Sequence, residues 1–202
     1  MLEINSREVF GIIVRKNSHK DMRKLKRELG TATIHGNKFW ASTSLLMDYL
    51  QLNPPMPNAR ILEIGCGWGI SGIHCAKYYA ARVTALDADA SVFPYVNYHA
   101  QLNGVTIQTC QQRYENITQA MLSEFDLVIA ADICFWDEMT APLLELIKRC
   151  YQAGVDRVVM TDPGRQPFRD MAEQCVEDYA ALYDNWSVPH PYNVSGLVVD
   201  IH

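Results

Sequence analysis

Short apolar segments alternate with longer amphipathic stretches over most of this 202-residue chain. Strands buried on both faces of a parallel sheet read as continuous apolar runs, and alternating strand and helix units place such strands parallel to one another. The pattern therefore predicts an α/β fold with a doubly wound, mostly parallel sheet and helices on both faces. The expected strands cover residues 60–64, 82–86, 105–110, 125–130 and 156–160, and the expected helices cover residues 70–80, 91–103, 114–123, 139–152 and 165–180.

The last part of the chain departs from this alternation. Residues 186–188 and 196–201 are apolar, and a segment with two prolines, Pro189 and Pro191, separates them. Proline favours turns and cannot donate to a central ladder. We therefore expect a C-terminal antiparallel hairpin at the end of the otherwise parallel sheet.

Three prolines between Asn53 and Asn58 exclude both a helix and a central strand there. We place a boundary at this point. Residues 1–53 are expected to form a basic arm, a small hairpin around Thr31–Phe39 and a helix from Ser42 to Leu52 with Ser42 as its N-cap. Residues 54–202 are expected to form the domain that contains the sheet.

The net charge of −5 argues against general affinity for nucleic acid. The charge is uneven, because residues 1–30 hold eight Lys and Arg against four Asp and Glu. This basic segment could be a solvated helix face, with Met22, Leu25 and Leu29 turned inward, or it could dock an acidic partner. The acidic remainder suits a basic substrate.

Six cysteines are scattered without a C-x-x-C pair or a histidine at metal-ligand spacing. This argues against a metal site and is typical of reduced, buried thiols. No apolar run approaches the roughly 20 residues of a membrane span, and the first residues do not resemble a secretory signal. We expect a cytoplasmic protein that does not enter membranes.

Four glycines, Gly65, Gly67, Gly69 and Gly72, follow the first strand of the expected sheet, where an open α/β sheet binds its ligand. Read from Gly67, they satisfy the dinucleotide pattern G-x-G-x-x-G. Glu63 lies within the strand, two residues before the first glycine. A carboxylate there disfavours a pyrophosphate and suits a ligand that carries an ammonium and a sulfonium.

Asp87 ends the next strand, 22 residues after Gly65. At this spacing a carboxylate accepts hydrogen bonds from both hydroxyls of an adenosine ribose. The alternative is a helix cap, but Asp89 and Ser91 can cap the following turn instead. We therefore favour the ribose role for Asp87.

A polar turn, which contains Arg113 and Tyr114, follows the third strand and is expected to border the purine ring. The alternative is an ordinary polar loop that starts a helix. After the fourth strand, the small residues Ala130 and Ala131 leave room for a ligand.

Asp132 follows Ala131, and the aromatic residues Phe135 and Trp136 come shortly after it. A carboxylate beside aromatic faces suits a basic or cationic group. The alternative is that Asp132 caps a turn while the aromatic side chains pack against the arm.

The segment Glu63-x-Gly65-x-Gly67-x-Gly69, followed by Asp87, resembles the cofactor signature of class I, seven-β-strand S-adenosylmethionine-dependent methyltransferases. These enzymes have a Rossmann-like fold. Asp132-x-x-Phe135 resembles the (D/E)-x-x-(Y/F) motif of the seven-β-strand protein lysine methyltransferases, a group also labelled nicotinamide N-methyltransferase-like. Phe39-Trp40-Ala41-Ser42 is similar to a tryptophan-containing segment of that group. Asp162-Pro163-Gly164-Arg165 is similar to a segment of members near the electron-transfer-flavoprotein β-subunit lysine methyltransferases.

The resemblance implies N-methylation of a protein lysine with S-adenosylmethionine as cofactor, S-adenosylhomocysteine as product and no metal. It implies an acceptor site made by Asp132, which positions the amine, with Phe135 and Trp136 around the alkyl stem. The implied cofactor-binding residues are Trp40, Glu63, Gly65, Cys66, Gly67, Gly69, Asp87, Ala88, Arg113, Tyr114, Ala130 and Ala131.

Two positions depart from the family pattern. Phe135 lacks the hydroxyl of the commoner tyrosine, and Arg113-Tyr114 stands where many relatives have an acidic residue and a tryptophan. Three other functions stay open: a methyltransferase for a small amine or nicotinamide-type acceptor, an NAD-dependent oxidoreductase and an inactive cofactor-binding module. The oxidoreductase is disfavoured by Glu63 and by the lack of a Tyr-x-x-x-Lys motif.

Overall fold

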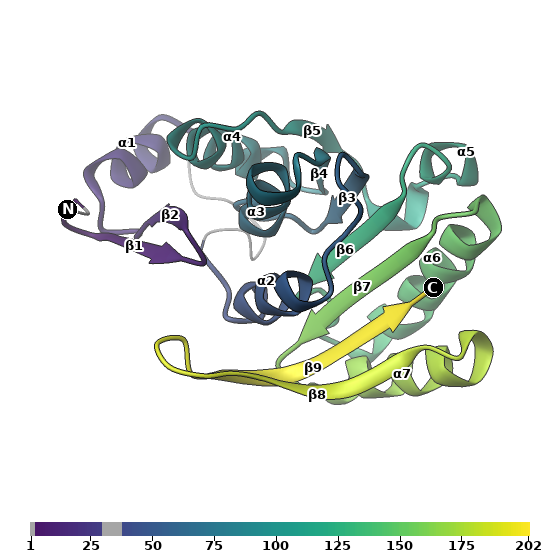
Figure 1. Ribbon diagram of the computed structural model, residues 1–202. Helices are drawn as coiled ribbons and strands as arrows, with labels where there is room; N and C mark the ends of the chain where they lie inside the picture. Colours follow the sequence, from purple (N-terminus) through teal and green to yellow (C-terminus); the bar gives the residue numbers. More distant parts are fainter. Residues whose placement is uncertain (1–2, 30–37) are drawn as a thin grey trace.

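The structure is a computed structural model that describes residues 3–29 and 38–202. Its centre is a seven-stranded sheet with the strand order β5-β4-β3-β6-β7-β9-β8 (Figure 1). The first five strands of this order run parallel, whereas β9 runs antiparallel to both of its neighbours. The expected mostly parallel sheet with a C-terminal antiparallel hairpin is confirmed.

The strand bounds agree with the apolar segments to within two residues except at the two edges of the sheet, where β8 starts four residues earlier and β5 three residues later than expected. The strands are β3 Arg60–Ile64, β4 Arg82–Asp87, β5 Gln108–Gln111, β6 Leu127–Ala131, β7 Arg157–Asp162, β8 Leu182–Val188 and β9 Val194–Ile201. Strand β5 starts three residues later than expected because Val105 and Ile107 pack on the core ahead of the strand. The strand itself is short and polar, as befits an edge.

Helices cover both faces of the sheet (Figure 1). One layer consists of α2 Ser42–Leu52, α3 Ile70–Tyr79 and α4 Phe93–Leu102, and the other of α5 Gln119–Leu122, α6 Thr140–Ala153 and α7 Gln166–Tyr179. Successive strand residues face opposite layers, as a pleated strand requires. Ile61 thus packs in the cluster of the first layer, whereas Leu62 packs in that of the second.

The helix expected over residues 114–123 is broken into two pieces. A single 3-10 turn, η2 Tyr114–Asn116, is followed by extended backbone at Ile117, whose side chain is fully buried. Thr118 then caps a new helix, because its hydroxyl oxygen accepts a hydrogen bond from the Met121 amide at 3.2 Å. A local cap and the burial of one apolar side chain thus override the helical spacing.

The N-terminal arm packs outside the first helical layer. Strands β1 Ser6–Val9 and β2 Ile12–Arg15 pair as a hairpin, and helix α1 Lys20–Leu29 follows. Met22 is fully buried, while Arg23 and Lys24 are exposed, so α1 presents a solvated basic face. The other hairpin, expected around Thr31–Phe39, falls mostly on residues 30–37, outside the described residues.

Ser42 is not the N-cap of α2, contrary to expectation. Ala41 occupies that position with helical backbone angles and makes no side-chain cap. The helical conformation therefore begins before Ser42, and its hydroxyl is directed toward the end of β6, where it donates to Asp132.

No helix among the described residues has the length and apolar character needed to cross a bilayer.

Candidate active site

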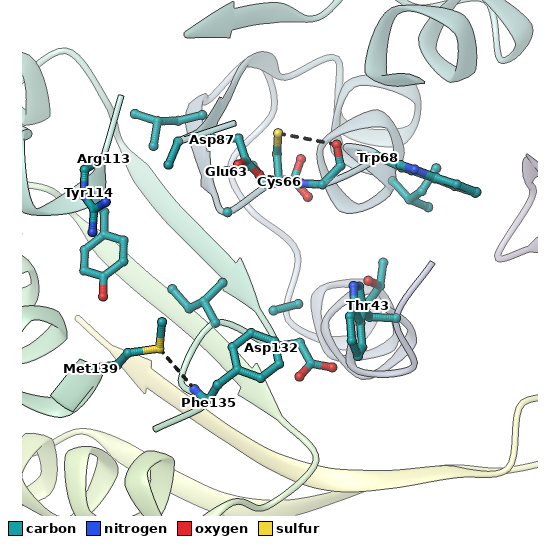
Figure 2. Close-up of a pocket in the computed structure, with 18 of the residues that line it drawn as sticks. Thr43, Glu63, Cys66, Trp68, Asp87, Arg113, Tyr114, Asp132, Phe135 and Met139 are labelled. Atoms are coloured by element: carbon teal, nitrogen blue, oxygen red, sulfur yellow. Dashed lines mark hydrogen bonds between the residues drawn. The ribbon is translucent and has the colours of Figure 1, made fainter. Parts of the chain in front are cut away.

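A cavity of about 270 Å³ lies at the carboxyl ends of β3, β4 and β6 (Figure 2). Its walls come from the glycine loop, the end of β4, the turn after β5, the loop after β6 and residues 38–43. Of the candidate residues, only Gly69 and Ala130 do not line it. Gly69 faces Val96 of α4, and Ala130 lies in the core cluster of the second helical layer. The cavity lining contains Trp40, Glu63, Gly65, Cys66, Gly67, Asp87, Ala88, Arg113, Tyr114, Ala131, Asp132, Phe135 and Trp136.

The glycine loop requires glycine at Gly65. This residue has a φ of +59°, in the left-handed region that favours glycine. A Cβ atom there would also lie 2.6 Å from Cγ2 of Ile133, which belongs to the loop after β6. The two loops therefore approach each other too closely for any larger residue at this position.

Glu63 connects β3 to the start of α3. Its Oε2 accepts a hydrogen bond from the Gly72 amide at 3.1 Å, and a Cβ atom on Gly72 would lie 2.6 Å from that oxygen. Burial raises the pKa of Glu63 to about 8, and the nearby charge of Asp87 contributes to the increase. Glu63 is therefore a buried carboxyl group whose ionised form a nearby cation would favour.

Asp87 fixes the other side of the loop. Its Oδ2 accepts from the Gly67 amide at 3.1 Å and its Oδ1 from the Asp89 amide at 2.9 Å. Asp89, and not Asp87, caps the following helical turn, since Oδ1 of Asp89 accepts a hydrogen bond from the Ser91 amide. A carboxylate offers about four acceptor sites, so Asp87 retains capacity for a ligand in the cavity. Burial also raises its pKa.

The turn after β5 is held from behind by an arginine that the sequence patterns did not reveal. Arg149 of α6 donates to the backbone carbonyls of Tyr114 and Glu115 at 3.2 and 2.9 Å. The Tyr114 side chain points toward the cavity (Figure 2), and burial raises its pKa to about 12. Arg113 is exposed and pairs with Glu115 at 3.1 Å. Tyr114 is thus the better placed of the two to border a ring.

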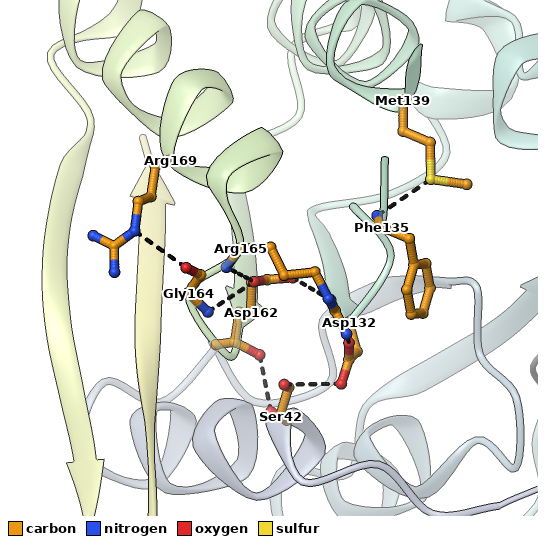
Figure 3. Close-up of polar contacts among 9 residues, drawn as sticks. Ser42, Asp132, Phe135, Met139, Asp162, Gly164, Arg165 and Arg169 are labelled. Carbon is orange, nitrogen blue, oxygen red and sulfur yellow. Dashed lines mark hydrogen bonds and ion pairs between the residues drawn. The ribbon is translucent and has the colours of Figure 1, made fainter. Parts of the chain in front are cut away.

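Asp132 is buried and its carboxylate has two side-chain partners (Figure 3). Its Oδ2 accepts from the Ser42 hydroxyl at 3.0 Å, and its Oδ1 forms an ion pair with Arg165. Its φ of +63° lies in the left-handed region, which is uncommon for residues other than glycine and which aspartate adopts more readily than most. The amide of Asp132 donates to the Thr161 carbonyl at 2.9 Å, which ties the strained residue to β7. Asp132 is consequently an anchored carboxylate.

Arg165 joins Asp132 to a second buried carboxylate. Its Nη1 donates to Oδ2 of Asp162 at 2.7 Å, while Oδ1 of Asp162 accepts from the amides of Gly164 and Arg165, both at 2.8 Å. The D-P-G-R segment was visible in the sequence, but no local pattern indicated that its arginine reaches across to β6. With one guanidinium between two carboxylates, the cluster of Asp132, Asp162 and Arg165 carries a net negative charge when all three are ionised.

Aromatic rings line the mouth beside this cluster. Phe135 makes an edge contact with Trp40, with 5.9 Å between ring centroids, and lies 5.7 Å from Trp136. Cations already occupy two of these faces: Arg165 Cζ lies 4.3 Å from the Phe135 centroid, and Lys38 Nζ lies 3.9 Å from the Trp40 centroid. This end of the cavity thus combines the Asp132 carboxylate with rings that attract cations.

Among residues 3–29 and 38–202, no group of three or more His, Cys, Asp or Glu side chains is arranged to hold a metal ion. All six cysteines are free, and five of them are buried. Burial raises the pKa of the Cys66 thiol, which lies in the glycine loop. This thiol is accordingly held neutral and contributes to the cavity wall as a small side chain.

The family model described as lysine methyltransferase matches residues 19–170. The chain belongs to the lysine methyltransferase family. Its curated relatives include the electron transfer flavoprotein beta subunit lysine methyltransferase of Rattus norvegicus, which is 30% identical over 132 residues, 64% of this chain and 51% of the relative. The protein-lysine N-methyltransferase EEF2KMT of Mus musculus is 29% identical over 126 residues, 54% of this chain and 38% of that relative. The chain spans about half the length of the first of these relatives and less of the second.

Solved structures of methyltransferases share the fold of this family member. The ribosomal protein L11 methylase of Lactobacillus delbrueckii subsp. bulgaricus aligns with a TM-score of 0.59 at 20% identity, over 80% of this chain and 77% of that one. The tRNA (uracil-54, C5)-methyltransferase of Pyrococcus abyssi, in complex with S-adenosylhomocysteine, aligns with a TM-score of 0.64 at 14% identity, over 98% and 44%. These likenesses show the fold alone.

The family implies S-adenosylmethionine as cofactor, and the residues of the cavity fit it. Neither Glu63 nor Asp87 forms an ion pair within the described parts of the chain, and burial raises the pKa of both. Two carboxyl groups without a cation suit a ligand that brings its own positive charge. The bare backbone at Gly65 allows that ligand to approach closely.

Proposed function

We propose that this chain is an S-adenosylmethionine-dependent protein methyltransferase that acts on the Nζ atom of a lysine side chain. One observation carries the proposal beyond the family: a single cavity joins the glycine loop to a mouth that contains the Asp132 carboxylate and aromatic faces. A lysine side chain has a long apolar stem and a cationic head, and this mouth is complementary to both.

The cofactor-binding half of the proposal concerns the residues around β3 and β4. Asp87 is expected to accept hydrogen bonds from the ribose, and Glu63 to face the positive end of the cofactor. Tyr114 is expected to border the adenine. The cofactor supplies a methyl group on a positively charged sulfur, so the protein mainly has to bind, orient and exclude water. The remaining cofactor-facing positions are Trp40, Gly65, Cys66, Gly67, Ala88, Arg113 and Ala131.

The acceptor half concerns the removal of a proton. A lysine amine has a reference pKa near 10.4 and must become neutral before it can act as a nucleophile. Phe135 and Trp136 are expected to surround the stem and exclude water, which favours the neutral amine. Asp132 is paired with Arg165, so we assign it the positioning of the acceptor wall and of the amine, and assign proton removal to solvent.

A protein acceptor is favoured over a small amine by the mouth itself. Trp136 stands at the edge of the cavity with 54% of its surface exposed. An exposed large aromatic side chain at a site entrance suits contact with a partner surface. A small acceptor needs no such contact outside the cavity. The small-amine function is therefore kept as an outcome of the test.

The test has two parts. Calorimetry with S-adenosylhomocysteine and, separately, with NAD⁺ decides the cofactor class; binding of NAD⁺ alone contradicts the proposal. Incubation of the chain with S-adenosylmethionine carrying a labelled methyl group and a cell lysate, followed by mass spectrometry, decides the acceptor. Label on protein lysines supports the proposal, label only in the small-molecule fraction contradicts the protein acceptor, and bound cofactor without any label contradicts an active enzyme. Asp87→Ala serves as the control, in which both signals should weaken.

A further inference from the structure

Lys38 lines the same cavity as the glycine loop and the acceptor residues. It lies two residues before Trp40, and its ammonium nitrogen rests 3.9 Å from the centre of the Trp40 ring. Trp40 in turn contacts Phe135 edge to face. A lysine of this chain thus lies on a ring that contacts Phe135, one of the two rings that the proposed function places around the stem of a substrate lysine.

The surroundings of Lys38 leave its amine available. It is exposed, and within the described residues it has no salt-bridge partner, whereas Lys24 and Lys148 pair with glutamates at 3.9 and 3.6 Å. The face of a tryptophan ring holds an ammonium only weakly at an exposed site. This contact guides the amine to the cavity without the cost of breaking a strong ion pair.

We propose that Lys38 is a methylation site of this chain, modified in cis by its own active site. The proposal rests on the proposed function. In the reaction, the Lys38 ammonium first gives a proton to water. The nitrogen lone pair then forms a bond to the methyl carbon of S-adenosylmethionine as the carbon–sulfur bond breaks. The electron pair of that bond stays on sulfur, and the products are methylated Lys38 and S-adenosylhomocysteine.

Lys77 provides a matched control within the chain. It also rests near an aromatic ring, with Nζ 5.7 Å from the Tyr78 centroid, and it donates a hydrogen bond to the Gly11 carbonyl at 2.8 Å. It does not line the cavity. A comparison of the two lysines therefore separates placement in the active site from contact with an aromatic face.

The experiment uses the full chain incubated with S-adenosylmethionine and no other protein, followed by peptide mass spectrometry. We expect methyl on Lys38, none on Lys77, and complete loss of the modification in Lys38→Arg. The fraction modified in a given time should not depend on protein concentration, because the reaction is in cis. Methylation that rises in proportion to concentration, or that marks Lys77 and the lysines of α1 equally, overturns the proposal.

A second measurement does not depend on turnover. An amine-reactive reagent is applied to the chain with and without S-adenosylhomocysteine, and the labelling rates of Lys38 and Lys77 are compared. We expect the ligand to slow the labelling of Lys38 alone. An unchanged Lys38 rate, with ligand binding verified by calorimetry, places Lys38 outside the cofactor cavity and overturns the proposal.

The two proposals fail in different ways. If the chain neither binds S-adenosylhomocysteine nor labels any protein, the proposed function is wrong. If it labels lysines of other proteins while Lys38 stays unmodified, only the inference about Lys38 is wrong.

Discussion

The two ends of the cavity use the same residue type in opposite ways. At the cofactor end, the carboxyl groups of Glu63 and Asp87 are held by backbone amides and have no cationic partner within the described residues. At the acceptor end, Asp132 and Asp162 share the guanidinium of Arg165. The first pair has no cation from the described residues, whereas the second pair shares one guanidinium.

The two pairs of carboxyl groups are therefore expected to have different roles, one in ligand binding and the other in positioning. Carboxyl groups that lack a cation gain most when a positively charged ligand arrives, so they contribute to binding. Carboxylates that already have hydrogen-bond and ion-pair partners are held in place without a ligand, so we expect them to position the loop after β6 and Phe135. We therefore expect substitutions at the cofactor end to change ligand affinity and those at the acceptor end to change stability and turnover.

The largest effect is expected for Arg165→Ala, which leaves Asp132 and Asp162 buried and unpaired. Removal of one partner from a buried ion pair typically costs about 3–5 kcal/mol of unfolding free energy. Thermal or denaturant unfolding measures this loss. Arg169→Ala is the matched control, because Arg169, in the first turn of α7, donates to the uncharged Gly164 carbonyl, a bond worth about 0.5–1.5 kcal/mol.

The milder change Arg165→Lys keeps the positive charge but cannot bridge two carboxylates with a fork. We expect this variant to fold, to bind S-adenosylhomocysteine normally and to lose turnover through kcat. If Arg165→Lys reduced the affinity for S-adenosylhomocysteine as much as it reduced kcat, the two ends of the cavity would not have separate roles.

The second largest effect is expected at the cofactor end. Asp87→Ala should weaken S-adenosylhomocysteine binding by about 10- to 100-fold, since hydrogen bonds to charged groups are worth about 1.5–3 kcal/mol. Calorimetry measures the affinity, and a circular dichroism melt checks that the domain is folded. Asp178→Ala, at an exposed position of α7, is the control. Unchanged affinity in Asp87→Ala contradicts the ribose assignment.

A third prediction concerns pH. Glu63 has a folded pKa of about 8 against 4.5 for the ordinary carboxyl group. Between these values the folded protein holds a proton that the unfolded chain has lost, so this group makes the fold less stable as pH rises from about 4.5 to 8. The stability of the unchanged chain relative to Glu63→Gln, which keeps an oxygen for the Gly72 amide, should therefore fall over this range, as the difference between their unfolding midpoints measures.

The same group should link cofactor binding to pH. A positively charged ligand favours the ionised form of Glu63. The affinity for S-adenosylmethionine should therefore rise as pH increases toward 8, with proton release on binding. S-adenosylhomocysteine, whose sulfur is neutral, should show a weaker dependence. Identical pH profiles for the two ligands would show that Glu63 does not sense the sulfonium.

The cofactor end was more predictable from sequence than the acceptor end, for a physical reason. Its residues lie within one strand–loop–helix unit and at the end of the neighbouring strand, so spacing along the chain is enough to bring Glu63, Gly65 and Asp87 together. The parallel strands were equally predictable from the sequence, because continuous apolar runs indicate burial on both faces of the sheet. Each of these signals is local.

The acceptor end depends on contacts between distant segments. Ser42 reads as a helix cap, but it donates to Asp132, 90 residues away. Arg165 reads as part of a turn, but it reaches across from the end of β7 to the end of β6. Such partners follow from the order of strands in the sheet, which spacing alone does not reveal. The anchored state of Asp132 could therefore not be derived from the motif that contains it.

The smallest effect is expected at the mouth of the cavity. Trp136→Ala removes an exposed ring from the acceptor end, and contacts of a cation with such a ring are worth about 0.5–1 kcal/mol. We expect KM for a protein acceptor to rise a few-fold, with kcat and the affinity for S-adenosylhomocysteine unchanged. Tyr151→Ala, an exposed aromatic position on α6, is the matched control and should leave KM unchanged. If Trp136→Ala lowers kcat instead, this ring acts on the bound amine. The acceptor end of the cavity would then reach further toward solvent than Asp132 and Phe135.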